Sequence, residues 1–435
     1  MKTRYFVVLA GVVGLASACS GSSSQSCVGT SSPLCTGTGR CIAIESCAKE
    51  SDIANAFASD QDGDTIAFAP GTYEFTNELA LGDGNGVTVV GPGASQVTLD
   101  FHGQQAGEDG VFAQSVSNLT LQGFTVLDTP GNGIKTLSVT GVSFLSLGIT
   151  WTNLDSTDGA YGVYPVQSSQ VLIDGCTISG ASDSGVYVGQ SQQIVVRNNE
   201  VFSNVSGIEI ENSFFADVHD NNAHDNTAGI LVFDLPGLQQ EGGHDVRVFN
   251  NTIHQNNTEN FALKSDIVSD VPGGTGFFVM ANHDVEVFGN TIEDNKTAGA
   301  GIISYALAQM SFSDPNYYEW PRNISLHDNT YSGNGTVPDA LSQVGLLLST
   351  GMAEYPDMHV PDVIWDGIVD PSLPAGPDPQ TICINEPSAS AVCNMHFDQI
   401  DMSNPNAGKT MVCDPTPFEC TLPALSPVTW AGLSP

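Results

Sequence analysis

The stretch IVVRNNEVFSNVSGIEI, residues 194–210, decides the fold. It holds a short alternating strand, an asparagine turn, a second apolar position, another turn, and a glycine that opens a further strand. The unit returns as VHDNNAHDNTAGILV at residues 218–232 and is preceded by VLIDGCTISGASDSGVYV at residues 171–188. Intervals of 22 and 23 residues dominate between the strand-opening glycines at positions 110, 133, 162, 185, 207, 229, 276 and 301. A period near 22 residues without helical spacing predicts one coil of a stacked parallel β-helix.

A column of asparagines supports this prediction. The residues that fall at the same turn of successive coils are Asn199, Asn221, Asn251, Asn290 and Asn329. Inward-pointing amides at one level per coil are expected to bond to one another and to the turn backbone, forming an asparagine ladder. Cys176 holds the equivalent place one coil earlier, so we expect a buried, unreactive thiol there.

A resemblance can now be stated. The segment GDTIAFAPGTY, residues 63–73, followed by these coils resembles the pectin-lyase-like superfamily of right-handed parallel β-helices. It is most similar to bacterial parallel β-helix repeat proteins grouped with carbohydrate-binding and sugar-hydrolysing domains. The resemblance covers residues 50–335 and implies an all-β solenoid of about ten coils. That superfamily includes pectate lyases, polygalacturonases, alginate epimerases and noncatalytic surface proteins, so it leaves the activity open.

The charge of the chain restricts its partners. Eleven Lys and Arg stand against 48 Asp and Glu, a formal net charge of -37. A field of that sign repels nucleic acid, so no nucleic-acid partner is expected. It also repels anionic polysaccharides unless Ca²⁺ or a local group of cations bridges the two partners.

The N-terminus predicts export. Lys2 and Arg4 precede an apolar run that ends in LASAC at residues 15–19. This order is typical of a lipoprotein signal peptide over 1–18, with Cys19 as the lipidated first residue of the mature chain. The alternative is an ordinary cleaved secretory signal. We expect a monomeric cell-envelope protein, held at the outer membrane or cell surface through Cys19.

The cysteines divide the rest of the chain. One quartet lies near the N-terminus and a second near the C-terminus, and two disulfides in each is the simplest expectation: Cys27, Cys35, Cys41, Cys47; Cys383, Cys393, Cys413, Cys420. We expect a tether and cysteine-rich segment at 19–47 and the β-helix at 48–335. Helical spacing at 42–56 predicts an N-terminal cap that protects the first strand edges. Residues 336–435 lose the repeat and gain proline, which predicts an irregular, disulfide-rich C-terminal tail.

Side chains between the inward positions predict a stripe on the outer face. Aromatic rings beside carboxylates suit sugars, because C–H faces stack on rings while hydroxyls bond to acids. The predicted substrate-binding residues are Tyr164, Tyr187, Phe233, Asp234, Phe278 and Tyr305. The alternative is that insertions or the tail cover this face and make its aromatic residues part of the core.

Catalysis requires more than aromatic residues. A pair among Asp158, Asp183, Glu209 and Glu211 could serve a hydrolase. A lyase or epimerase needs a base and a cation, and Lys264 supplies them only if its insertion folds over the stripe. Ca²⁺ is the expected cofactor, because stacked carboxylates and carbonyls are the ligands that it prefers.

Two functions therefore remain open. The first is a lipoprotein that binds a polysaccharide and processes it as a lyase, epimerase or hydrolase. The second is a noncatalytic scaffold or adhesin, whose loops at 235–243 and 265–274 meet a protein partner. An open stripe favours the first function and a buried stripe favours the second.

Overall fold

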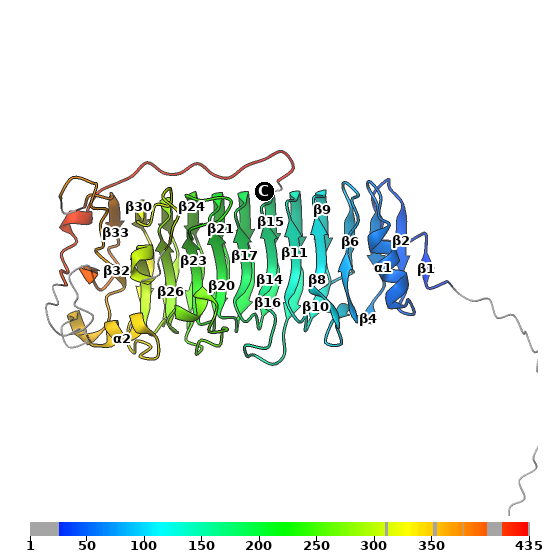
Figure 1. The fold of residues 1–435 in the computed structure, drawn as a ribbon, viewed down its shortest axis with the longest axis horizontal. Coiled ribbons are helices and arrows are strands. Elements are labelled where there is room, and N and C mark those ends of the chain that lie inside the picture. Colours follow the sequence, from blue (N-terminus) through cyan, green and yellow to red (C-terminus); the bar gives the residue numbers. More distant parts are fainter. Residues whose placement is uncertain (1–25, 309–311, 351–354, 377, 398–410, 434–435) are drawn as a thin grey trace, which may run out of the picture.

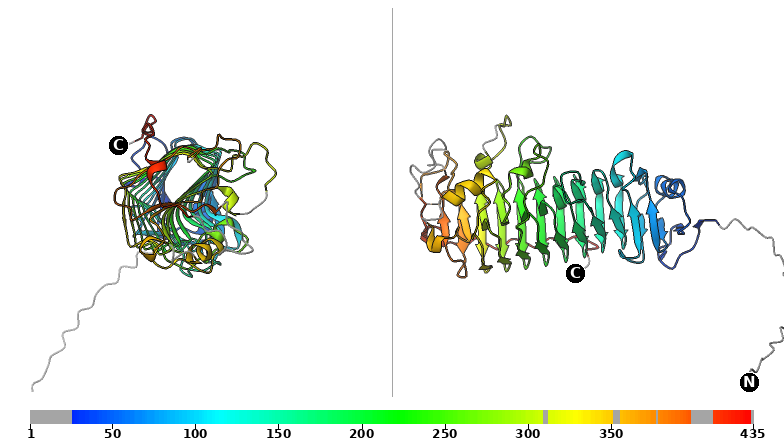
Figure 2. Two further views of the ribbon diagram at one scale, coloured as in Figure 1. Left: turned by 90° about the vertical axis from the view of Figure 1, so that its left-hand side faces the viewer. Right: turned by 90° about the horizontal axis from the view of Figure 1, so that it is seen from below.

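The computed structural model describes residues 26–308, 312–350, 355–376, 378–397 and 411–433, and the predicted lipidation site Cys19 lies outside them. Three long sheets run side by side along a rod, and the chain visits them in turn (Figure 1). Seen along the rod, the sheets enclose one tube (Figure 2). Apart from the antiparallel start, β1 with β2, the strands pair in parallel with the coils before and after. The predicted parallel β-helix is confirmed.

Each sheet takes one strand from each coil. Sheet A has 13 strands, in spatial order β1 (Val28–Gly29), β2 (Cys41–Ile44), β3 (Thr65–Phe68), β6 (Thr88–Val90), β9 (Ser117–Gln122), β12 (Thr140–Leu145), β15 (Ser169–Asp174), β18 (Gln192–Arg197), β21 (Phe214–His219), β24 (His244–Phe249), β27 (His283–Phe288), β30 (Arg322–His327) and β33 (Ile382–Asn385). Sheet B has 10 strands, β4 (Gly71–Glu74), β7 (Val97–Asp100), β10 (Thr125–Leu127), β13 (Gly148–Thr150), β16 (Thr177–Ser179), β19 (Glu200–Phe202), β22 (Asn222–His224), β25 (Thr252–His254), β28 (Thr291–Glu293) and β31 (Thr330–Ser332). Sheet C has 11 strands, β5 (Asn77–Ala80), β8 (Ala106–Gln114), β11 (Asn132–Leu137), β14 (Tyr161–Val166), β17 (Ser184–Gly189), β20 (Ser206–Glu211), β23 (Ala228–Phe233), β26 (Thr275–Met280), β29 (Ala298–Ile303), β32 (Val363–Trp365) and β34 (Val392–Asn394).

The core of the rod is a set of columns. On sheet C, Val186, Ile208 and Ile230 occupy one register on successive strands and are fully buried. Alternation sends these side chains inward and their neighbours outward. Each coil therefore buries its apolar edge against the coils before and after it, which is why a single unit could not fold alone.

Two asparagine ladders line the turns on either side of sheet B. In the predicted ladder, the side-chain amide of Asn199 donates to Asn221 Oδ1 at 2.9 Å, and the pattern continues to Asn329. A second ladder, which the sequence analysis missed, contains Asn204, Asn226, Asn256, Asn295 and Asn334. Both ladders also satisfy backbone groups of neighbouring coils, so buried turn amides keep hydrogen-bond partners. Cys176 is a free, buried thiol, and burial raises its pKa to about 12.

The N-terminal end is capped by a helix and two disulfides. Cys27 pairs with Cys47 and Cys35 with Cys41, in agreement with the predicted quartet. The helix α1 spans Glu50–Ala58 and packs Phe57 against Phe68 of the first coil. The predicted helical range 42–56 was wrong at its start, because Cys41–Ile44 pairs with β3 as strand β2. Strand pairing outweighed the helical spacing of that segment.

The coils also continue beyond residue 335, where the repeat pattern was expected to end. Strands β32, β33 and β34 extend sheets A and C up to Asn394, and the helix α2 (Gln343–Thr350) lies in the long connection before them. The short helix η4 (Pro356–Met358) lies in the same connection, and η1 (Ile267–Asp270), η2 (Tyr305–Ala308) and η6 (Thr416–Phe418) lie elsewhere along the chain. Insertions within the last coils hide their period. No helix in the described ranges is long and apolar enough to cross a membrane.

The C-terminal segment runs back along the outside of sheet A (Figure 1). The second cysteine quartet ties it down, with Cys383 bonded to Cys420 and Cys393 to Cys413. Its residue Val428 packs on Leu172 and Val195. In Figure 1 this segment lies on the opposite side of the rod from the long loops, so it leaves sheet C uncovered.

Candidate functional site

The outer face of sheet C changes character along the rod. Parallel pairing places Lys135, Tyr164, Tyr187, Glu209, Leu231, Phe278 and Gly301 at one register of successive strands. A second outer column, two residues later, contains Gly189, Glu211, Phe233, Met280 and Ile303. The face thus passes from tyrosines through carboxyl groups to hydrocarbon, over a few coils about 4.8 Å apart.

Three tyrosines form a cluster at the first of these positions. The ring centroids of Tyr161 and Tyr187 lie 4.5 Å apart, and those of Tyr164 and Tyr187 lie 5.0 Å apart. The ammonium of Lys135 lies 5.1 Å from the centroid of the Tyr164 ring. Lys135 is the single Lys or Arg on the described strands of sheet C. The cluster is a rigid aromatic surface with one cation at its edge.

Three carboxyl groups follow the tyrosines. Asp183 precedes β17, and Glu209 and Glu211 project from β20; their exposures are 6%, 2% and 5%. Burial raises the pKa of Asp183 to about 7. Burial, with the Asp183 carboxylate beside it, raises the pKa of Glu209 well above its ordinary value and that of Glu211 to about 8. These groups hold protons near neutral pH because the fold removes water from them without supplying a cation.

Hydrogen bonding separates two of these carboxyl groups. The hydroxyl of Tyr161 bonds to Asp183, which opposes the rise in the pKa of Asp183; burial and the Asp183 charge raise the pKa of Tyr161 itself. Glu209 Oε1 is fully buried without a hydrogen bond of ordinary geometry, and the Ser206 hydroxyl is the one group that opposes the rise in the pKa of Glu209. Asp183 is therefore the group that ionises more readily, whereas Glu209 keeps a proton and a free oxygen. Pairs of acids whose pKa values are driven apart in this way are typical of acid–base sites.

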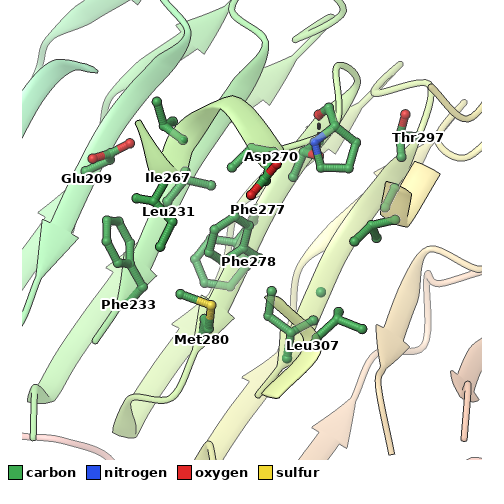
Figure 3. Close-up of a pocket in the computed structure, with 18 of the residues that line it drawn as sticks. Glu209, Leu231, Phe233, Ile267, Asp270, Phe277, Phe278, Met280, Thr297 and Leu307 are labelled. Carbon is green, nitrogen blue, oxygen red and sulfur yellow. Dashed lines mark hydrogen bonds between the residues drawn. The ribbon is translucent and has the colours of Figure 1, made fainter. Parts of the chain in front are cut away.

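A hollow of about 210 Å³ opens beside these carboxyl groups. Figure 3 shows Glu209 at one end, then Leu231 and Phe233, then Phe278 and Met280, with Leu307 beyond them. Ile267 and Asp270, from the insertion between β25 and β26, overhang it. Val344 and Leu348 of α2 close the far end. The insertion and the connection after β29 narrow the stripe to a hollow and bury most of its side chains. Leu231, Phe233 and Met280 belong to a packed cluster, whereas Phe278 stays partly exposed.

Some predicted residues meet at this site and others do not. The structure brings together Asp183, Glu209, Glu211, Tyr187, Phe233 and Phe278 around the hollow, with Tyr164 beside them in the tyrosine cluster. Asp158 lies apart and accepts hydrogen bonds from Asn153 and from the backbone of Leu154, so it stabilises its own loop. Asp234 accepts from the backbone N–H groups of Gly242 and Gly243, and it closes the 235–243 loop.

Two further residues, Lys264 and Tyr305, do not lie where the sequence predicted them. Lys264 is exposed and does not line the hollow, although its insertion does fold over the stripe. Tyr305 was expected on the stripe, but β29 ends at Ile303 and pairs Ile303 with Met280. Tyr305 instead begins η2 and packs against Tyr317 at 5.4 Å. The error came from taking Gly301 as the strand-opening glycine, whereas Gly299 is the one that pairs with Gly276.

Two residues of the site were missed. Tyr161 was overlooked because it stands before the strand-opening Gly162, yet it contacts both other tyrosines. Lys135 occupies the same register as Tyr164 one coil earlier. Alignment of the strand-opening glycines would have identified both. In paired parallel strands, residues at the same distance from that glycine lie side by side.

The described residues do not fit a calcium site. No group of three or more His, Cys, Asp or Glu in the described ranges is arranged to hold a metal ion. The three carboxyl groups at the hollow have pKa values raised by burial, so a hard cation would have to displace their protons first. The chemistry of this face is that of buried acids.

Comparison with known proteins agrees with this architecture. Residues 85–237 match the family model described as the right handed beta helix region. The chain is a right-handed parallel β-helix. Over 226 residues it is 22% identical to a mouse protein, SHC SH2 domain-binding protein 1; the match covers 49% of this chain and 28% of that relative.

Solved structures similar to this β-helix include the mannuronan C-5 epimerase AlgE4 A-module of Azotobacter vinelandii, 15% identical with a TM-score of 0.46, covering 78% of this chain and 91% of that one. An alginate lyase from Paenibacillus sp. is 16% identical with a TM-score of 0.41, covering 68% and 96%. An exopolygalacturonase from Thermotoga maritima is 13% identical with a TM-score of 0.43, covering 63% and 76%. At these identities the likeness concerns the fold, so activity has to be argued from the site.

Proposed function

We propose that this protein binds an uncharged polysaccharide along sheet C and hydrolyses it at the buried carboxyl groups. The observation that carries the proposal is the pairing of Asp183 with Glu209 at the edge of an open hollow, both acids deprived of water and of cations. A uronate carboxylate placed here would meet carboxyl groups and no Lys or Arg among the lining residues. This favours hydrolysis of a neutral glycan over the lyase and epimerase reactions.

The two acids have different roles in this proposal. Glu209, which keeps its proton at neutral pH, donates it to the glycosidic oxygen as the bond to the anomeric carbon breaks. Asp183, with a pKa of about 7 and the Tyr161 hydroxyl bonded to it, is ionised in part of the molecules and accepts the proton of the attacking water. Glu211 is a third buried acid, and its pKa of about 8 keeps it largely protonated at neutral pH.

The tyrosine cluster supplies the sugar platform. Tyr164 and Tyr187 face outward at the register that leads to Glu209, and their rings are held by contact with Tyr161. A pyranose C–H face stacks on such rings, which orients the neighbouring glycosidic bond toward the acids. Binding in this orientation needs no metal ion, so we expect activity to persist in the presence of a Ca²⁺ chelator.

We also propose that the protein is exported and anchored through Cys19. All eight cysteines of the two quartets are paired in disulfides, which persist in oxidising compartments. Radiolabelled palmitate should label the full-length chain in cells and should not label a Cys19→Ser variant. Labelling that survives this substitution would refute the anchor without affecting the proposed hydrolysis.

A noncatalytic scaffold is the second candidate. It is favoured by the packing cluster beside the hollow, in which Phe233 and Leu231 are buried together with Tyr305 and Tyr317 from the neighbouring connections. In that case the outer aromatics stabilise the loops that a protein partner would contact. The absence of turnover together with the absence of sugar binding would support this function.

The deciding experiment uses the chain without residues 1–24 and a panel of neutral and uronate polysaccharides. Reducing ends, unsaturated-uronate absorbance and binding are followed together, with Ca²⁺ and with a chelator. We expect reducing ends from a neutral glycan, lost in Asp183→Asn and Glu209→Gln. Glu200→Gln is the matched control, because Glu200 belongs to the same coil but is exposed on sheet B. Unsaturated products would instead identify a lyase.

A further inference from the structure

The hollow beside the acids is unsuited to bare sugar. Beyond Glu209 its floor is Leu231, Phe233, Phe278 and Met280, and its overhanging wall is Ile267 and Val271. These side chains neither donate nor accept hydrogen bonds. A sugar hydroxyl buried against them would lose its water without gaining a partner, at a cost of about 1–3 kcal/mol for each group. The lining therefore selects hydrocarbon.

The polar end of the same hollow has an unmet hydrogen-bonding group. Glu209 lines the space, and its Oε1 is buried without a hydrogen bond of ordinary geometry, with the Ser206 hydroxyl as the nearest group to interact with the carboxyl. A buried carboxyl oxygen left in this state is costly unless a ligand or water completes it. A hydroxyl at the mouth of the hollow would do so, and it would place an attached hydrocarbon group against Leu231 and Phe278 (Figure 3).

We propose that the hollow is a subsite for an uncharged hydrocarbon substituent, an acyl or alkyl chain carried by a sugar whose hydroxyl groups bond to Glu209. The inference rests on the proposed function, and it specifies the substrate as a hydrophobically substituted glycan. Free fatty acids and phosphorylated lipids do not fit, because no Lys, Arg or His is among the residues that line the space. Their anionic heads would face Glu209, Glu211 and Asp183.

The insertion between β25 and β26 explains why this chain has such a subsite. Its residues Ile267 and Val271 pack on the cluster formed by Leu231, Phe233 and Met280. It thus adds an apolar wall to a strand face that the connection after β29 covers only in part. Wall and floor together allow a chain to be contacted on several sides. Each methylene withdrawn from water then contributes about fourfold in affinity.

The test compares hexyl β-D-glucoside with methyl β-D-glucoside, below the concentration at which the former makes micelles. Calorimetry on the chain without residues 1–24 should give at least ~30-fold tighter binding of the hexyl compound, from three buried methylenes or more. Octanoate at pH 8 should bind far more weakly than the hexyl glucoside. A ratio near one, or octanoate that binds as tightly, would overturn the subsite.

Gly301 offers a variant that fills the hollow without removing any packing. It lines the space, and a Cβ built on it meets its nearest atoms, Phe278 Cβ and Ile364 Cγ1, at 3.5 and 3.9 Å, ordinary contact distances. Gly301→Leu should reduce the hexyl-to-methyl ratio at least ~10-fold, since the added side chain occupies the space of the bound methylenes. Gly301→Ala is the matched control and should keep most of the ratio. An unchanged ratio in the leucine variant would place the chain elsewhere and refute the inference.

A second pair of variants keeps the test independent of this glycine. Phe278→Ala should reduce the ratio several-fold, whereas Phe112→Ala, at the same outer register of β8 and away from the hollow, should not. Equal effects of the two variants would contradict the proposal. The wild-type chain separates the two proposals: a hexyl preference without turnover of any glycan would contradict the hydrolase proposal alone, and turnover without a hexyl preference would contradict this one alone.

Discussion

Charged side chains lie on the outer faces of both sheet A and sheet C. The two sheets differ in whether those side chains have partners. On sheet A, Arg247 bonds to Asp217 through two nitrogens at 2.7 Å, and the backbone of Val428 in the returning tail also donates to Asp217. On sheet C, no Lys or Arg is among the described residues that line the hollow with Glu209 and Asp183. Charges that the fold satisfies stabilise it, whereas charges that the fold leaves unsatisfied indicate a site.

The same contrast applies to the segments that cover each face. The tail on sheet A bonds to the outer residues directly, with the Leu425 N–H donating to Glu286 and Trp430 packing near Leu172. The insertion on sheet C packs Ile267 and Val271 on outer side chains of the strands, but it leaves a hollow beside Glu209. A segment that covers a sheet argues against a functional site only where it also satisfies the hydrogen bonds of the polar groups beneath it.

The largest expected difference between the two sheets concerns the rate of glycan hydrolysis. Glu209→Gln should reduce hydrolysis of the responsive glycan by about 10²–10⁴-fold, because the proton for the leaving oxygen is lost. Initial rates of reducing-end formation measure it. Glu286→Gln, a buried glutamate on sheet A, should leave the rate within about twofold. Comparable losses in both variants would mean that the two faces do not differ in function.

Breaking the main ion pair of sheet A should affect stability instead. Arg247→Met leaves Asp217 buried without its cation, which should lower the free energy of unfolding by about 3 kcal/mol. Urea denaturation provides the measurement, and limited proteolysis reports release of the tail. Arg322→Met is the control, because Arg322 is exposed and stacks on Tyr318, so its loss should cost well under 1 kcal/mol. Equal stability of the two variants would show that the sheet A pair is not structural.

The pH dependence of stability should come from sheet C. Folding raises the pKa of Asp183 to about 7 and that of Glu211 to about 8, from ordinary values of 3.8 and 4.5. The unfolded chain therefore releases these protons first, and stability should fall as pH rises from about 4 to about 8. Glu211→Gln should remove about 3 kcal/mol of that decline between pH 5 and pH 8, at about 1.4 kcal/mol for each pKa unit, and make the variant more stable than the wild type at pH 8. Urea midpoints at pH 5 and pH 8 test this; a parallel pH dependence in both proteins would exclude Glu211 as a source.

The smallest effect concerns the cation at the edge of the tyrosine cluster. Lys135→Met removes the ammonium from the Tyr164 ring, which should cost about 0.5–1 kcal/mol of sugar binding through looser placement of that ring. Calorimetry with the responsive glycan gives the affinity. Lys296→Met, on the turn between β28 and β29, serves as the control and should have no effect. If binding of the neutral glycan falls by orders of magnitude in Lys135→Met, then Lys135 contacts the sugar itself.

The fold was predictable because its signal is local and repeated. A glycine, an alternating strand and an asparagine turn recur every 22 or 23 residues, and each copy specifies the same pairing with its neighbours, so errors in one coil are corrected by the next. The disulfide quartets and the buried Cys176 followed from position alone. Where two glycines lie two residues apart, at Gly299 and Gly301, the wrong one was taken to open the strand and Tyr305 was misplaced.

The acids of the site were identifiable as a group, but not their individual states. Alternation placed Glu209 and Glu211 on the outer face of β20. It could not distinguish them from Asp158 and Asp234, whose oxygens accept hydrogen bonds from their own loops. That distinction depends on the conformations of the loops. Because these do not repeat from coil to coil, the sequence pattern does not predict them.

By itself, then, the sequence determined a right-handed β-helix with cross-linked ends and an outer stripe of aromatic and acidic residues, because stacking makes equal sequence offsets into contacts. Only the tertiary structure decided that the tail covers sheet A, that an insertion builds an apolar hollow on sheet C, and that Glu209 is buried beside the hollow with one oxygen lacking a well-formed hydrogen bond. These properties depend on contacts between segments far apart in the sequence, and each contact occurs at one place only. Such contacts determine burial and desolvation, and no local sequence pattern encodes them.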